Sequence, residues 1–100
     1  MSAFTLLLVA GLLGASEAPE TIEHVVQRGE TLWSIAAQQE VYGDPYLWVL
    51  IYKFNRDQIK DPSRIYPNQR LQIPVGLDAE ARSSARLEAG APAAARERAP

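Results

Sequence analysis

Two short strand-like segments lie at opposite ends of residues 24–74, and they limit the possible folds more than any other feature of the chain. His24-Val25-Val26-Gln27 is rich in β-branched residues and stops at Arg28-Gly29, whereas Arg70-Leu71-Gln72-Ile73-Pro74 alternates between polar and apolar residues. Two such short strands are unstable as an isolated pair. Their apolar sides must therefore be covered by the residues that lie between them.

The first half of the intervening segment carries the signals of a helix. Thr31 is a candidate N-cap, and Glu30 places a negative charge near the positive end of the helix dipole. Tyr42-Gly43 is expected to end this helix. Its predicted inner face has helical spacing and comprises Leu32, Ile35, Ala36 and Gln39.

Asp44-Pro45 marks the start of a second helix, because an N-cap residue is followed by proline at the first helical position. The helix is predicted from Tyr46 to Asn55. Trp48 and Tyr52, four residues apart, lie on a different face from the predicted core positions. These core positions are Leu47, Leu50, Ile51 and Phe54.

The order strand, helix, helix, strand predicts an α+β fold of β-α-α-β type. A two-stranded antiparallel sheet is expected, covered by the two helices. The segment Tyr66-Pro67-Asn68-Gln69 predicts a tight turn before the closing strand. Asn68 tolerates the left-handed conformation of such a turn better than most residues other than glycine.

The first 18 residues have the pattern of a signal peptide. Residues 4–13 form an apolar run that is too short to cross a bilayer core of about 30 Å, and Ser16 and Ala18 satisfy the small-x-small rule for cleavage. We therefore predict a signal peptide over residues 1–18, with an N-terminal membrane anchor as the alternative, and a short linker over residues 19–23. The processed chain is expected to be exported to the periplasm or cell wall, without stable membrane insertion.

The C-terminal residues 75–100 are rich in alanine, arginine and glutamate. The stretch from Asp78 to Ala89 favours helix, but short isolated helices are marginal in water. Leu77 and Leu87 are the large apolar side chains available to anchor such a helix on a partner. We predict a disordered tail over residues 75–100.

The composition excludes several classes of function. The 100 residues contain no cysteine and one histidine, which argues against a structural zinc site and a thiol nucleophile. The net charge of −2 argues against nucleic acid as a partner. Neither a metal nor a cofactor is predicted, and a charge near zero favours an uncharged ligand.

Two blocks of residues resemble the LysM domain, a small module of bacterial cell-wall proteins. The segment from His24 to Ala36 is similar to the opening strand, turn and first helix of that family, although Glu30 stands where the family usually has aspartate. The segments 51–55 and 65–74 are similar to the end of its second helix and to its closing turn and strand, with Asn68 in place of the usual glycine. The resemblance predicts a LysM domain over residues 24–74.

The resemblance implies a non-catalytic module that binds N-acetylglucosamine units of peptidoglycan or a related polymer in a shallow groove. The groove would lie between the loop after the first strand and the loop after the second helix. Its implied lining residues are Gly29, Glu30, Thr31, Leu32, Pro62, Ile65 and Tyr66. Each also has a structural interpretation, in the turn, the helix cap or the core.

Several other residues and functions are compatible with the sequence. Asn55 is expected to tie the end of its helix to the following loop, and Trp33 and Trp48 are expected to cover neighbouring elements rather than contact glycan. A grouping of Ser34 and His24 with an aspartate is available in composition alone, so no catalytic residue is predicted. The main alternative function is the docking of a cell-envelope protein, and binding of a monovalent cation is a more distant one.

Overall fold

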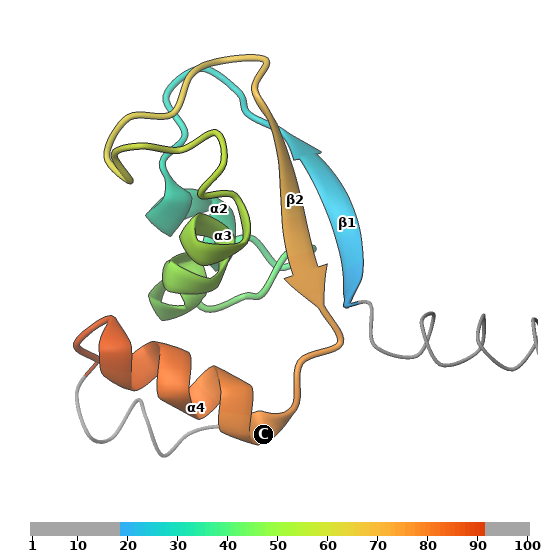
Figure 1. The fold of residues 1–100 in the computed structure, drawn as a ribbon, viewed down its shortest axis with the longest axis vertical. Coiled ribbons are helices and arrows are strands. Elements are labelled where there is room, and N and C mark those ends of the chain that lie inside the picture. The colour runs from blue at the N-terminus through green and yellow to red at the C-terminus, as the bar shows by residue number, and fades with distance from the viewer. Residues whose placement is uncertain (1–18, 92–100) are drawn as a thin grey trace, which may run out of the picture.

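The computed structural model describes residues 19–91, which form a small two-layer domain with an additional helix at its C-terminal end (Figure 1). The predicted signal peptide, residues 1–18, lies outside the described residues. The elements follow in the order β1 (Glu20–Val25), α2 (Leu32–Ala37), the 3-10 helix η1 (Pro45–Leu47), α3 (Trp48–Phe54), β2 (Arg70–Val75) and α4 (Ala79–Glu88). The predicted α+β fold of β-α-α-β type is confirmed for the part from β1 to β2.

The two strands pair antiparallel, as predicted, in a register that runs from Glu20 opposite Val75 to Val25 opposite Arg70. Strand β1 begins at Glu20, so most of the residues predicted to be a linker belong to the sheet. Pairing extends beyond the strands, because Val26 N–H donates to the Gln69 carbonyl at 2.8 Å. The turn before β2 has Asn68 in the left-handed region with φ 72°, as the sequence predicted.

Helix α2 begins where the sequence predicted and ends earlier. Thr31 is the N-cap, and it exchanges hydrogen bonds with Ser34: Ser34 N–H donates to Thr31 Oγ1 at 3.0 Å, and Thr31 N–H donates to Ser34 Oγ at 2.9 Å. The helix ends at Ala37, so the placement of Gln39 on its inner face was wrong. A turn with Gly43 at φ 63° follows instead.

The second helical segment starts at Asp44-Pro45, as predicted, but its first turn is the 3-10 helix η1. Because a 3-10 turn holds about three residues rather than 3.6, it changes which later side chains face inward. Leu47 and Ile51 are buried as predicted. The next residue on the same helix face, four positions further on, is Asn55, whose side-chain amide is also buried. Phe54, predicted in the core, is 40% exposed, so that prediction was wrong.

The main core lies between the sheet and helices α2 and α3 (Figure 1). Asn55 joins the two layers: its Nδ2 donates to the carbonyls of Ile51 and Gln72 at 2.7 and 2.8 Å, and its Oδ1 accepts from Gln72 N–H at 2.9 Å. Asn55 is structural, as predicted, but its side chain ties the helix to strand β2 rather than to the following loop. The buried core side chains are Val26, Leu32, Ile35, Ala36, Ile51, Ile59, Leu71 and Ile73.

Helix α4 contradicts the prediction of a disordered tail for the residues it contains. Asp78 is its N-cap and accepts from Ala81 N–H at 2.8 Å, and the helix contacts both η1 and α3 (Figure 1). Ala85 and Arg86 are buried, whereas Leu87, considered above as an anchor, is 61% exposed. The helix packs through alanine methyl groups and an arginine stem, so it needs none of the large apolar residues that the tail lacks. Residues 92–100 lie outside the described part.

Two ion pairs connect α4 to the helices beside it. Arg86 Nε pairs with Asp44 Oδ2, and both side chains are largely buried. Lys53 Nζ lies 2.7 Å from Glu88 Oε1, and both of these side chains are about half exposed. The N-cap of η1 is therefore also the point where α4 is attached.

Candidate functional site

The loop between β1 and α2 is a tight turn that requires glycine at its centre. Gly29 has φ 88°, in the left-handed region that side chains disfavour, and Glu30 N–H donates to the Gln27 carbonyl at 3.0 Å. Apart from Gly29 and its two chain neighbours, no atom of the described residues lies within 4 Å of the position that a Cβ would occupy at Gly29. The backbone of this turn is therefore open to an approaching ligand.

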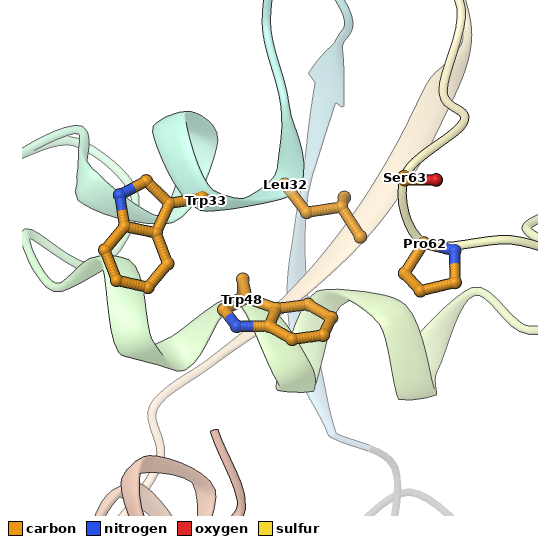
Figure 2. Close-up of a pocket in the computed structure, with 5 residues that line it drawn as sticks. All are labelled: Leu32, Trp33, Trp48, Pro62 and Ser63. Carbon is orange, nitrogen blue, oxygen red and sulfur yellow. The ribbon is translucent and has the colours of Figure 1, made fainter. Parts of the chain in front are cut away.

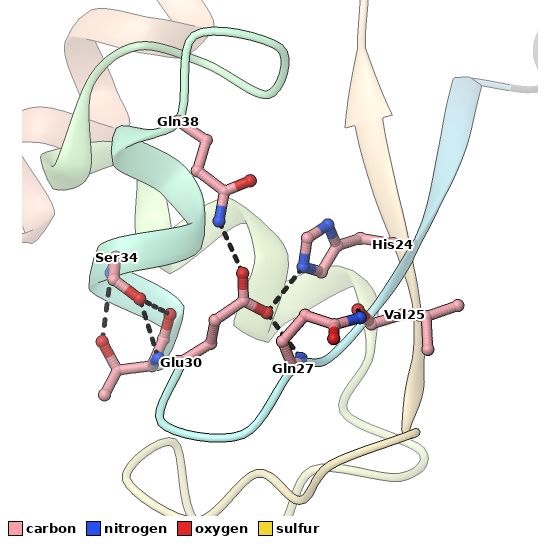
Figure 3. Close-up of polar contacts among 7 residues, drawn as sticks. His24, Val25, Gln27, Glu30, Ser34 and Gln38 are labelled. Carbon is pink, nitrogen blue, oxygen red and sulfur yellow. Dashed lines mark hydrogen bonds and ion pairs between the residues drawn. The ribbon is translucent and has the colours of Figure 1, made fainter.

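Glu30, predicted to line the groove, is held within the domain by three partners (Figure 3). Its Oε1 accepts from Gln27 N–H at 2.7 Å and lies 2.9 Å from His24 Nε2, and its Oε2 accepts from Gln38 Nε2 at 2.6 Å. Burial raises the pKa of Glu30, but the hydrogen bonds from Gln27, His24 and Gln38 outweigh it and lower the pKa overall. This carboxylate links β1, the turn and the end of α2.

The two residues that follow Glu30 divide between the surface and the core. Thr31 is exposed, and its hydroxyl oxygen is occupied as acceptor in the cap of α2 while its hydrogen remains available for donation. Leu32 is buried in the core. It nevertheless contributes to the lining of a pocket between α2, α3 and the loop after α3 (Figure 2).

The loop after α3 forms the facing side of the site. Asp61 Oδ1 accepts from the backbone N–H and the hydroxyl of Ser63 at 3.0 and 2.8 Å, and these bonds lower the pKa of Asp61. They fix the turn that presents Pro62. Ile65 packs against the core, and Tyr66 is exposed.

A shallow pocket of about 250 Å³ lies between the first turns of α2 and α3 and the loop after α3 (Figure 2). Trp33 is at one end, Pro62 and Ser63 are at the other, and Leu32 and Trp48 lie between them. None of these five lining side chains is charged. The pocket can therefore offer apolar contact and a hydroxyl group, but no general acid or base.

The pocket brings together only part of the predicted groove. Leu32 and Pro62 line it, whereas five other predicted residues lie outside its lining: Gly29, Glu30, Thr31, Ile65 and Tyr66. The prediction that both tryptophans cover neighbouring elements captured only part of their role. Trp33 is 46% exposed and Trp48 is half-buried, and both line the pocket. A signal was present for Trp33, since it lies in the first turn of α2, directly after a loop, whereas Trp48 follows η1 without an intervening loop.

The structure does not assemble the catalytic grouping considered from composition. Ser34 bonds to Thr31, and His24 bonds to Glu30. Within residues 19–91, no group of three or more His, Cys, Asp or Glu side chains is placed to hold a metal ion. In the same range, no helix is both long enough and apolar enough to cross a membrane.

A two-stranded sheet covered by two helices, with a shallow uncharged pocket between the helices and the loop after α3, defines a small α+β module. The family model for the LysM domain matches residues 24–74, and the chain belongs to this family.

Three proteins are similar to part of the chain. Treponemal membrane protein B of Treponema pallidum (strain Nichols) is 42% identical over 48 residues, which are 45% of this chain and 15% of that protein. Potassium binding protein Kbp of Escherichia coli O6:H1 is 38% identical over 60 residues, 60% of this chain and 39% of that protein. Resuscitation-promoting factor Rpf of Micrococcus luteus is 38% identical over 55 residues, 55% of this chain and 22% of that protein. The chain spans less than half the length of each of these relatives.

Proposed function

We propose that this LysM domain is a non-catalytic module that binds the N-acetylglucosamine-containing glycan of peptidoglycan. The observation that carries the proposal is the uncharged pocket between the first turns of α2 and α3 and the loop after α3, next to the turn that holds Gly29 and Thr31. Peptidoglycan glycan presents sugar rings, hydroxyl groups and amides, which are recognised by shape, hydrogen bonds and apolar contact rather than by charge.

The predicted groove residues divide into two roles. Gly29 leaves the backbone of the turn accessible to an N-acetyl amide, and the exposed Thr31 hydroxyl supplies a hydrogen bond. Leu32, Pro62 and Ile65 give apolar contact, and the exposed ring of Tyr66 offers a face for a sugar. Glu30, whose carboxylate is occupied by three partners, shapes the loop instead of binding the glycan.

The absence of catalysis is part of the proposal. A glycoside hydrolase needs two carboxyl groups, about 5–9.5 Å apart, on either side of the bond that it cleaves. The five residues that line the pocket include no carboxylate, and Glu30 and Asp61 are engaged in their own loops.

The proposed ligand requires that the chain leave the cytoplasm. We therefore propose that residues 1–18 direct export and that the processed chain acts in the periplasm or cell wall. Peptidoglycan itself is the proposed partner, without nucleic acid and without lasting insertion into a membrane.

Sedimentation with insoluble peptidoglycan tests the proposal. Purified residues 19–100 should be retained on peptidoglycan, and soluble N-acetylglucosamine oligomers should release them. A single shallow site predicts a dissociation constant between about 10 μM and about 1 mM, so the protein concentration must reach that range. Lack of retention with a normal thermal melt would overturn the proposal and favour the docking of a cell-envelope protein.

A further inference from the structure

We propose that Trp33 and Trp48 form an aromatic subsite that holds one uncharged sugar ring beside the loop groove. The inference rests on the proposed glycan function, but it assigns the strongest contacts to residues that sequence patterns placed against neighbouring helices. In Figure 2, Leu32 and Trp48 lie between Trp33 and Pro62, so the pocket continues from the loop after α3 onto the first turns of α2 and α3.

The position of Trp33 is set by neighbouring structure. Its ring meets Tyr46 edge to face, with centroids 4.9 Å apart and planes at 78°. The backbone that carries Tyr46 is held in turn, because its N–H donates to the N-cap carboxylate of Asp44 at 3.0 Å. An indole that is already ordered loses little freedom on binding, so more of its contact energy contributes to affinity.

Trp48 forms the floor of the subsite. It packs against the main core and still lines the pocket, so one part of the indole is fixed while another part remains available. Trp33, by contrast, is 46% exposed although one edge of its ring contacts Tyr46, and it lines one end of the pocket, so apolar surface of this indole remains available to a ligand.

The chemistry of the lining selects the class of ligand. Two indoles, a leucine and a proline favour the C–H face of a pyranose ring, and the Ser63 oxygen can accept a hydrogen bond at the edge. An anionic group would lose hydration there without gaining a charged partner, because no lining side chain is charged. A volume of about 250 Å³ suits a single ring rather than a longer glycan segment.

Intrinsic fluorescence gives a direct test, since the chain contains two tryptophans and both line the pocket. N-acetylglucosamine oligomers of increasing length should change the emission of the full chain. In the single-tryptophan variants Trp33→Phe and Trp48→Phe, the remaining indole should report the same binding event. Trp33→Ala should weaken oligomer binding about fivefold or more.

Phe54→Ala is the matched control. Phe54 is also a partly exposed aromatic residue on a helix, at 40%, but it does not line the pocket. Its replacement should leave the affinity unchanged. Ser63→Arg is a second test that alters neither indole: a long charged side chain at the far end of the pocket should also reduce oligomer affinity.

The outcomes separate the subsite from the proposed function. The subsite is supported if three results are obtained together: the chain is retained on peptidoglycan, oligomers change its tryptophan emission, and both Trp33→Ala and Ser63→Arg weaken oligomer binding. If the chain is retained but its emission is constant and both variants bind normally, the subsite is wrong while the glycan function stands. If neither peptidoglycan nor oligomers bind, both are overturned. The subsite is also wrong if the isolated peptide part of peptidoglycan changes the tryptophan emission and the N-acetylglucosamine oligomers do not.

Discussion

Replacing Arg86 by methionine should destabilise the domain by about 2 kcal/mol, because it removes the ion pair that attaches α4. The side chain of Arg86 is 6% exposed and that of its partner Asp44 is 19% exposed. Methionine retains much of the apolar stem, so the substitution removes the charge while preserving most of the packing. The measured loss therefore reports on the ion pair rather than on a cavity.

The magnitude follows from the surroundings of the pair. A hydrogen bond to a charged group contributes about 1.5–3 kcal/mol, and breaking a fully buried pair costs about 3–5 kcal/mol. Asp44 keeps some solvent contact and its bond from Tyr46 N–H, which favours the lower end. Within residues 19–91, moreover, the buried Nη1 of Arg86 has no hydrogen-bond partner, which reduces what the pair contributes. For a domain of this size, about 2 kcal/mol lowers the Tm by about 8–16 °C.

Urea unfolding, followed by circular dichroism, measures the change in the free energy of unfolding. Lys53→Met is the control, since Lys53 also connects α4 through an ion pair, to Glu88, but both side chains are about half exposed. That substitution should cost at most about 1 kcal/mol. Asp44→Asn keeps an N-cap residue, so a double-mutant cycle with Arg86→Met isolates the coupling energy of the pair.

The attachment of α4 would be refuted if Arg86→Met stayed within about 0.5 kcal/mol of the wild type, as expected for a surface position. Deletion of residues 78–100 should destabilise the domain at least as much as the point substitution. A deletion without effect on the Tm would restore the interpretation of the segment as a tail.

Ile35→Asp should unfold the domain, because Ile35 is fully buried and an unpaired carboxylate there costs several kcal/mol; loss of the far-ultraviolet dichroism signal checks this. Asn55→Ala should cost about 3 kcal/mol in urea unfolding, since it leaves the backbone N–H of Gln72 without its partner. Because the pKa of Glu30 is lowered on folding, the stability that it supplies is present above its ordinary value of 4.5 and is lost as the pH falls through the lowered folded value. Glu30→Gln should therefore show a smaller loss of stability than the wild type between about pH 6 and about pH 3. Mass spectrometry of the exported chain should show residues 1–18 removed, and an intact chain in the membrane fraction would support an anchor instead.

The parts of the fold that sequence predicted depend on local chemistry. The capping of α2 by Thr31, the start at Asp44-Pro45 and the left-handed turn at Asn68 each follow from what a residue does with its own neighbours. Helix α4 depends instead on a distant contact, and its buried groups are small or charged. A search for large apolar side chains therefore gave no sign that the helix packs.

The site was predicted less completely than the fold, for a related reason. Leu32 and Pro62 were found through the resemblance, but the pocket also needs Trp33 and Trp48. Trp33 contacts Tyr46, a residue distant in the sequence, and the direction of Trp48 depends on how η1 begins α3. Helical periodicity assumes a regular turn from the first residue. Since η1 is a 3-10 turn, the pattern could not give the directions of the side chains that follow it.

Strands β1 and β2 are paired in space but lie at opposite ends of the module's sequence, and this separation affects how the chain folds. Helices α2 and α3 contain only six and seven residues, too few to be stable alone. The sheet pairs Glu20 with Val75, so its formation must close a long loop before any strand contact is gained. No stable partial structure is expected while β2 is still missing. A nascent chain that ends before Arg70 should remain protease-sensitive, and completion of the second strand should convert it in one cooperative step.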